Sequence, residues 1–79
     1  MSISVPAART AALFTSPLQP SAAPDERTIA EAIRDAVRAF GTRGCAAHVA
    51  QEYGDHPDEA AGRMRWVRSL LPDPRGGTP

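Results

Sequence analysis

The sequence predicts an all-α fold. One three-helix domain spans residues 24–71, its second and third helices form a helix-turn-helix, and a flexible N-terminal arm and a C-terminal tail flank it. Apolar side chains recur at helical spacing throughout residues 24–71. Prolines and other helix-breaking residues gather before and after that stretch. A chain of 79 residues has room for one such domain and little more.

Residues 1–23 make up the arm. Pro6, Pro17 and Pro20, with serines and alanines around them, predict an extended or disordered segment. Three large apolar side chains interrupt this composition, and we expect them to dock onto another surface: Leu13, Phe14 and Leu18. Residues 72–79, with three prolines and two glycines, are expected to form a disordered tail.

The first predicted helix begins after Pro24, where Asp25 and Glu26 suit the positive end of a helix. Gly41 is a natural stop for it. Its inner face carries Ile29, Ile33, Ala36, Val37 and Phe40. On its outer side, two i,i+3 pairs of opposite charge favour the same helix: Glu31 with Arg34, and Asp35 with Arg38.

The second helix is expected to run from a Thr42 cap to Tyr53, where Gly54 ends it with a positive φ in a short turn. The third helix is expected to be capped by Asp55, to carry Pro57 in its first turn and to end near Leu71. The three apolar faces then share one core, which consists of Ile33, Val37, Phe40, Val49, Ala50, Tyr53, Met64, Val67 and Leu71.

Composition argues against a strongly charged partner. All nine cationic residues are arginine, nine acidic residues balance them, and the formal net charge is zero. The chain therefore lacks the long-range attraction to nucleic acid or anionic lipid that a basic protein has. Cys45 is the single cysteine, so no intrachain disulfide can form and the cytoplasm is the expected location. We expect no membrane-spanning segment.

A set of residues in the second and third predicted helices carries a resemblance: Val49-Ala50, Tyr53-Gly54, Ala60, Arg63-Met64, Val67-Arg68 and Leu71. Residues 49–71 resemble the helix-turn-helix of the fourth conserved region of bacterial sigma factors, which binds the upstream promoter element. This resemblance implies a role in transcription. The wider run from Gly44 to Trp66 is similar to short uncharacterised proteins of actinomycete bacteria, a likeness that implies no activity.

The third helix supplies the candidate DNA-binding residues, Arg63, Arg65 and Arg68. Asp58 and Glu59 near its leading end would repel phosphate. The helix therefore predicts a weak, local contact with DNA at most.

Trp66 and Leu70 lie beside the core-facing stripe of the third helix and form an apolar strip next to Arg63. We expect either the chain itself, through the first helix or the arm, or another protein to cover this strip. Trp and Arg are enriched at interface hot spots. The candidate partner-binding residues are therefore Trp66, Leu70, Leu13, Phe14 and Leu18.

Cys45, His48 and His56 match no zinc-ligand spacing, so we expect no metal site and no cofactor. Cys45 is expected to be a small buried side chain. A Cys-His nucleophile needs a pocket and a third, orienting group, so we expect no catalytic residue and no enzyme activity.

The leading hypothesis is a small regulatory protein that acts on transcription by contacting DNA or a transcription component. The alternative is an adaptor that binds another protein through Trp66, Leu70 and the arm, without nucleic acid. The salt dependence of binding distinguishes the two hypotheses, because affinity for DNA falls steeply as the salt concentration rises and affinity for an apolar docking site does not.

Overall fold

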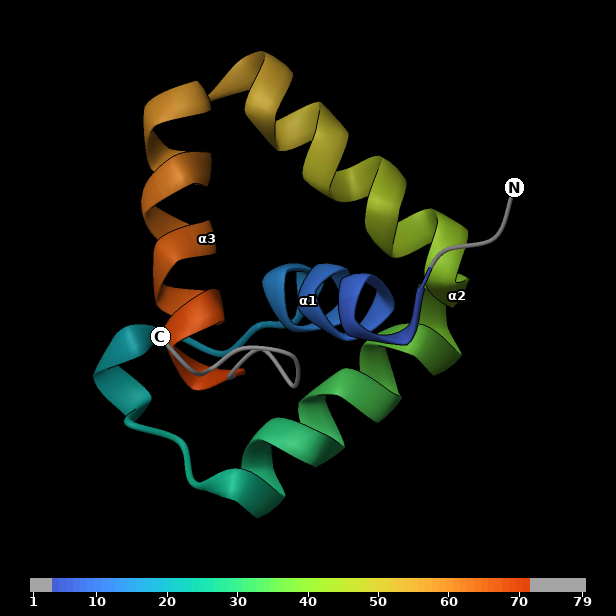
Figure 1. Ribbon diagram of the computed structural model, residues 1–79, viewed down its shortest axis with the longest axis vertical. Helices are drawn as coiled ribbons and strands as arrows, with labels where there is room; N and C mark the ends of the chain where they lie inside the picture. The colour runs from blue at the N-terminus through green and yellow to red at the C-terminus, as the bar shows by residue number, and fades with distance from the viewer. Residues whose placement is uncertain (1–3, 72–79) are drawn as a thin grey trace.

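The computed structural model describes residues 4–71 and confirms the all-α fold. It contains α1 (Val5–Thr15), the short 3-10 helix η1 (Pro20–Ala22), α2 (Glu26–Asp55) and α3 (Pro57–Leu70), and no strand within residues 4–71. Figure 1 shows α2 bent into an elbow, with α1 inside the elbow and α3 alongside its open end. No helix in residues 4–71 is long and apolar enough to cross a membrane. The expected tail at residues 72–79 lies outside the described residues.

Helix α1 overturns the expectation of an extended or disordered arm. Ser4 caps it by accepting a hydrogen bond from the Ala7 N–H at 3.3 Å, and Pro6 falls in the first turn, where a helix needs no N–H donor. Residues 7–14 contain neither proline nor glycine and are rich in alanine, the strongest helix former. Pro17 ends the helix by forcing Ser16 into an extended conformation (φ −63°, ψ 162°).

Helix α2 begins where the sequence predicts a helix. The Asp25 carboxylate caps it by accepting a hydrogen bond from the Thr28 N–H at 2.8 Å, and this bond lowers the pKa of Asp25. The expected stop at Gly41 is present as a kink, with φ 73° and ψ 165° inside an otherwise helical run. The two arms of α2, residues 26–40 and 42–55, therefore correspond to the first and second predicted helices.

The expected turn at Gly54 is wrong. Helix α2 continues through Gly54 and Asp55, and His56 alone separates it from α3. Pro57 explains the break, because a proline disfavours the helical conformation of the residue before it, and His56 has φ −140° and ψ 67°. Asp55 therefore ends α2 instead of capping α3, which has no side-chain cap. The joint between the helices is shorter than the expected helix-turn-helix turn.

The core is centred on α1, not on a junction of three apolar faces. Its first cluster consists of Leu13, Phe14, Ile29, Ala60, Met64 and Val67. The second consists of Ala11, Ala12, Ala36 and Cys45. The predicted burial of Met64 and Val67 is confirmed.

The rest of the expected core is buried less than predicted. Phe40 is 60% exposed, Tyr53 is 39% exposed and Ala50 is also exposed. Four others are only partly buried: Ile33, Val37, Val49 and Leu71. The physical reason is that α1 fills the inside of the elbow, so the helix faces that meet α1 are buried and those directed past it are not (Figure 1).

Candidate functional site

Arg63, a candidate DNA-binding residue, makes its hydrogen bonds within the molecule. It extends from α3 to the C-terminal end of α1, where its Nε donates to the Phe14 carbonyl at 2.7 Å and its Nη2 to the Ser16 carbonyl at 2.8 Å. A longer bond of 3.5 Å joins Nη2 to the Leu13 carbonyl. These carbonyls lie at the end of a helix, where intrahelical donors run out and the dipole favours a cation. Partial burial lowers the pKa of Arg63. In this conformation Arg63 is engaged within the molecule, and its assignment to DNA contact stays a prediction.

Trp66 and Leu70 are partly buried against the first core cluster, as the intramolecular version of the covering prediction requires. The Arg63 guanidinium carbon lies 5.3 Å from the centre of the Trp66 ring and 5.7 Å from that of Phe14. Leu13 and Phe14 are only 0% and 2% exposed, so neither is available to a partner in this conformation. Both residues belong to the first core cluster, and their assignment to partner binding stays a prediction.

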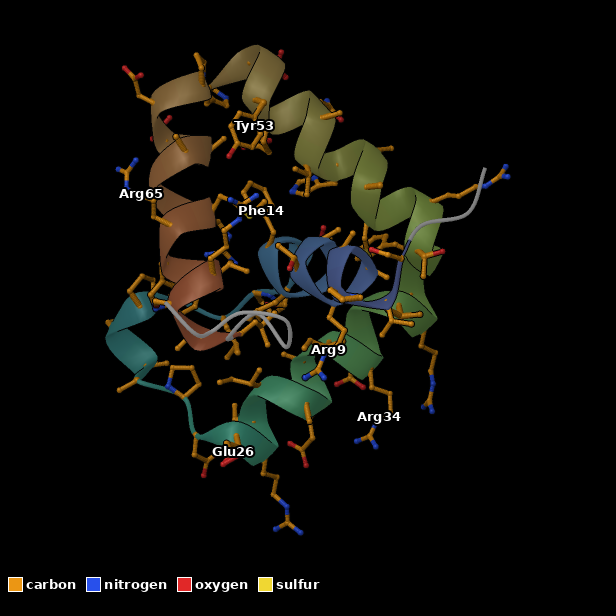
Figure 2. All side chains as sticks on the ribbon, in the orientation of Figure 1. Arg9, Phe14, Glu26, Arg34, Tyr53 and Arg65 are labelled. Carbon is orange, nitrogen blue, oxygen red and sulfur yellow. The ribbon has the colours of Figure 1, made fainter. Side chains whose placement is uncertain are left out.

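The other two candidate DNA-binding residues, Arg65 and Arg68, are exposed on α3. Figure 2 shows Arg65 directed away from the helices. Asp58 and Glu59 are exposed in the first turn of α3, and His56 Nδ1 lies 3.5 Å from Glu59 Oε1. The exposed face of α3 thus combines two cations with two carboxylates and is not a strongly basic surface.

Cys45 and His48 are also used in packing. Cys45 is fully buried, as expected, and its thiol donates to the Ala36 carbonyl at 3.7 Å. The Phe14 ring meets that of His48 edge to face, with 6.1 Å between ring centres. It stacks with the Tyr53 ring at 6.4 Å between centres (Figure 2). Within residues 4–71 no three metal-ligating side chains come together.

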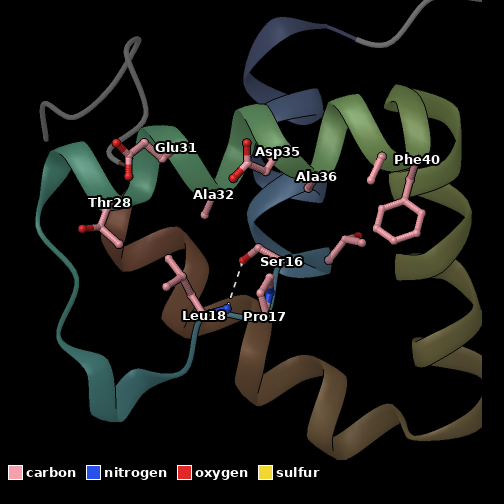
Figure 3. Close-up of a pocket in the computed structure, with 11 residues that line it drawn as sticks. Ser16, Pro17, Leu18, Thr28, Glu31, Ala32, Asp35, Ala36 and Phe40 are labelled. Atoms are coloured by element: carbon pink, nitrogen blue, oxygen red, sulfur yellow. Dashed lines mark hydrogen bonds between the residues drawn. The ribbon is translucent and has the colours of Figure 1, made fainter.

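An open groove lies between the end of α1 and the first arm of α2, and we call it the α1–α2 groove. Its volume is about 400 Å³. One side is the segment after α1, and the other is the N-terminal arm of α2 (Figure 3). The lining residues are Thr15, Ser16, Pro17, Leu18, Thr28, Glu31, Ala32, Asp35, Ala36, Ala39 and Phe40. Of the candidate partner-binding residues, Leu18 is the one that lies here.

The groove has an apolar interior and an acidic edge. The Ser16 hydroxyl is already hydrogen-bonded within the chain, because it donates to the Leu13 carbonyl at 2.7 Å and accepts from the Leu18 N–H at 3.4 Å. Glu31 and Asp35 lie along the α2 edge, and Phe40 closes one end (Figure 3). No cationic side chain is among the described residues that line it.

Periodicity could not have identified this groove. Phe40 falls on the same helical stripe as Ile29, Ile33 and Ala36, which predicts burial. It is the last residue before the Gly41 kink, and the chain turns away there, which leaves the ring exposed. Its position directly before a predicted helix stop was the one available signal.

Comparison of the chain with protein-family models, with curated proteins and with solved structures yields no match.

Proposed function

We propose that this chain is a small non-enzymatic regulatory protein that acts by binding another protein in the α1–α2 groove. The observation that carries the proposal is the 60% exposure of Phe40 at the end of that groove. An exposed aromatic ring beside an apolar depression is typical of an interface, where a few such side chains contribute most of the binding energy. The proposal keeps the adaptor hypothesis and moves its surface from Trp66 and Leu70 to Phe40.

The other candidate binding residues make contacts within the molecule, which supports the choice of Phe40 as the binding residue. Arg63 and Trp66 hold α1 against α3, and Leu13 and Phe14 are buried. Phe40 belongs to neither core cluster and makes none of these contacts, so a partner could bind its exposed ring without disturbing the core.

Peptide selection tests the proposal. A random 12-residue phage-displayed library is selected on the immobilised full chain, and enriched peptides are synthesised for fluorescence anisotropy. We expect Phe40→Ser to weaken their binding at least about tenfold, the loss typical of a hot-spot aromatic. Val5→Ser is the matched control, because Val5 is 71% exposed and does not line the groove.

Circular dichroism establishes that both variants keep the helical content of the unsubstituted chain. Enriched peptides that bind the Phe40 variant as tightly as the unsubstituted chain would contradict the proposal. Failure to enrich any peptide that binds the chain would also contradict it.

A second candidate function is contact with DNA through α3. It is favoured by the exposure of both Arg65 and Arg68 on that helix, together with the resemblance to sigma-factor region four. The internal role of Arg63 leaves this candidate with two of its three proposed phosphate contacts.

A further inference from the structure

We propose that the α1–α2 groove binds a basic amphipathic peptide segment of a partner protein. The aliphatic or aromatic side chains of this segment lie on the groove floor against Phe40, and its Arg or Lys side chains pair with Glu31 and Asp35. This inference rests on the proposed function, since it names the chemistry of the partner for the same groove.

Charge along the groove selects for a cationic partner. Glu31 and Asp35 are the two ionisable residues that line it, both are exposed, and both are acidic. They are an i,i+4 pair on α2, so they lie one turn apart on the same edge of the helix, with about 6 Å between their Cβ atoms. A partner helix with cations at i and i+4, or a strand with cations at i and i+2, matches that spacing.

The two carboxylates are available for such pairing. Among residues 4–71, the carboxylate that lies within 4 Å of a side-chain nitrogen of Arg or His is that of Glu59, beside His56, so neither groove carboxylate takes part in a salt bridge. The pairs expected with Arg34 and Arg38 are therefore not formed in this conformation. Both arginines are exposed nearby on α2 and compete with a partner, but exposed pairs at this spacing are weak.

The groove floor selects for apolar side chains. Ala32, Ala36 and Ala39 of α2 contribute only methyl groups to the lining. Pro17 and Leu18 form the opposite wall (Figure 3). The volume of about 400 Å³ is within the range of small-ligand sites. Apolar contact supplies affinity here, and the acidic edge supplies orientation and selectivity.

The test uses the selected peptides and the double variant Glu31→Gln/Asp35→Asn of the full chain. We expect the peptides to be enriched in Arg and Lys, and the double variant to bind them about tenfold more weakly with a flatter salt dependence. The matched control is Glu26→Gln/Asp55→Asn, which removes the same charge from exposed positions of α2 outside the groove. The control is expected to leave affinity unchanged.

The outcomes separate this inference from the proposed function. If Phe40→Ser abolishes binding while the groove double variant keeps full affinity, the basic partner is excluded and the proposed function stands. If Phe40→Ser leaves binding intact, both fail.

A third measurement concerns a second copy of this chain as occupant. Sedimentation of the unsubstituted chain is expected to give a monomer. A dimer that Phe40→Ser dissociates would place a second copy in the groove and overturn the assignment to a basic peptide.

Discussion

Arg63 joins two elements that are far apart in the sequence. Its planar guanidinium donates in two directions, to the carbonyls of Phe14 and Ser16, and its central carbon lies over the rings of Phe14 and Trp66. The arginine therefore satisfies backbone acceptors that the end of α1 leaves without intrahelical donors, and it covers apolar surface at the same time. From the sequence alone, an arginine on a presumed recognition helix indicates phosphate contact, because nothing local shows that α1 ends beside it.

We predict that Arg63→Met lowers the free energy of unfolding by about 1–3 kcal/mol, since charge-assisted hydrogen bonds to partly buried carbonyls are lost. Arg63→Lys is expected to recover only part of this loss, because one ammonium does not reproduce the fork that bonds two carbonyls. Urea denaturation measures both. Arg65→Met is the control and should change stability by less than about 0.5 kcal/mol, as Arg65 is exposed. Equal losses at the two positions would show that the Arg63 contacts do not stabilise the fold.

The course of α2 depends on two glycines with opposite roles. Gly41 has φ 73° and ψ 165°, a conformation accessible almost only to glycine, and the bend there makes room for α1. Gly54 lies within the helix, and a Cβ added there would meet nothing within 4 Å. The sequence marks both as stops, since glycine favours helix ends, but Pro57 rather than Gly54 ends α2.

We therefore predict opposite effects for the same substitution. Gly41→Ala should destabilise the fold by about 1–3 kcal/mol through backbone strain alone, because a Cβ there also meets nothing within 4 Å. Gly54→Ala should stabilise it by about 0.5–1 kcal/mol through improved helix propensity. Thermal unfolding followed by circular dichroism measures both. A loss of stability for Gly54→Ala would indicate that Gly54 lies in a turn and not within the helix. An unchanged stability for Gly41→Ala would indicate that residue 41 does not have the glycine-specific conformation of the kink.

At the scale of the whole molecule, local signals predicted most of the helices but not how they pack. The Asp25 start, the Gly41 break and the Met64–Val67 face follow from capping, backbone freedom and periodicity within a few residues. The number of prolines in the arm does not predict its helix, because Pro6 lies in the first turn, where a helix tolerates proline. The exposure of Phe40 does not follow from periodicity, because it depends on where α1 ends inside the elbow, which is set by tertiary packing.

The distribution of charge over the whole molecule determines how strongly DNA would be attracted to α3. The described arginines other than Arg63 are exposed and spread over all three helices, at positions 9, 27, 34, 38, 43, 65 and 68. Only Arg65 and Arg68 belong to α3, and its first turn carries two carboxylates. A molecule without net charge has no basic face to concentrate DNA near that helix.

We predict that any mobility shift of DNA at low salt is weak, with a slope of about −2 for log affinity against log salt, since each phosphate contact contributes close to one released counterion. Arg65→Gln/Arg68→Gln should abolish such a shift, whereas the control Arg34→Gln/Arg38→Gln, which removes the same charge from exposed positions of α2, should keep it. A shift that survives the α3 variant would exclude α3 as a DNA-binding surface, because no other described arginine of that helix is free. A much steeper slope that both variants reduce equally would instead indicate general attraction to the exposed arginines, which carries no sequence recognition.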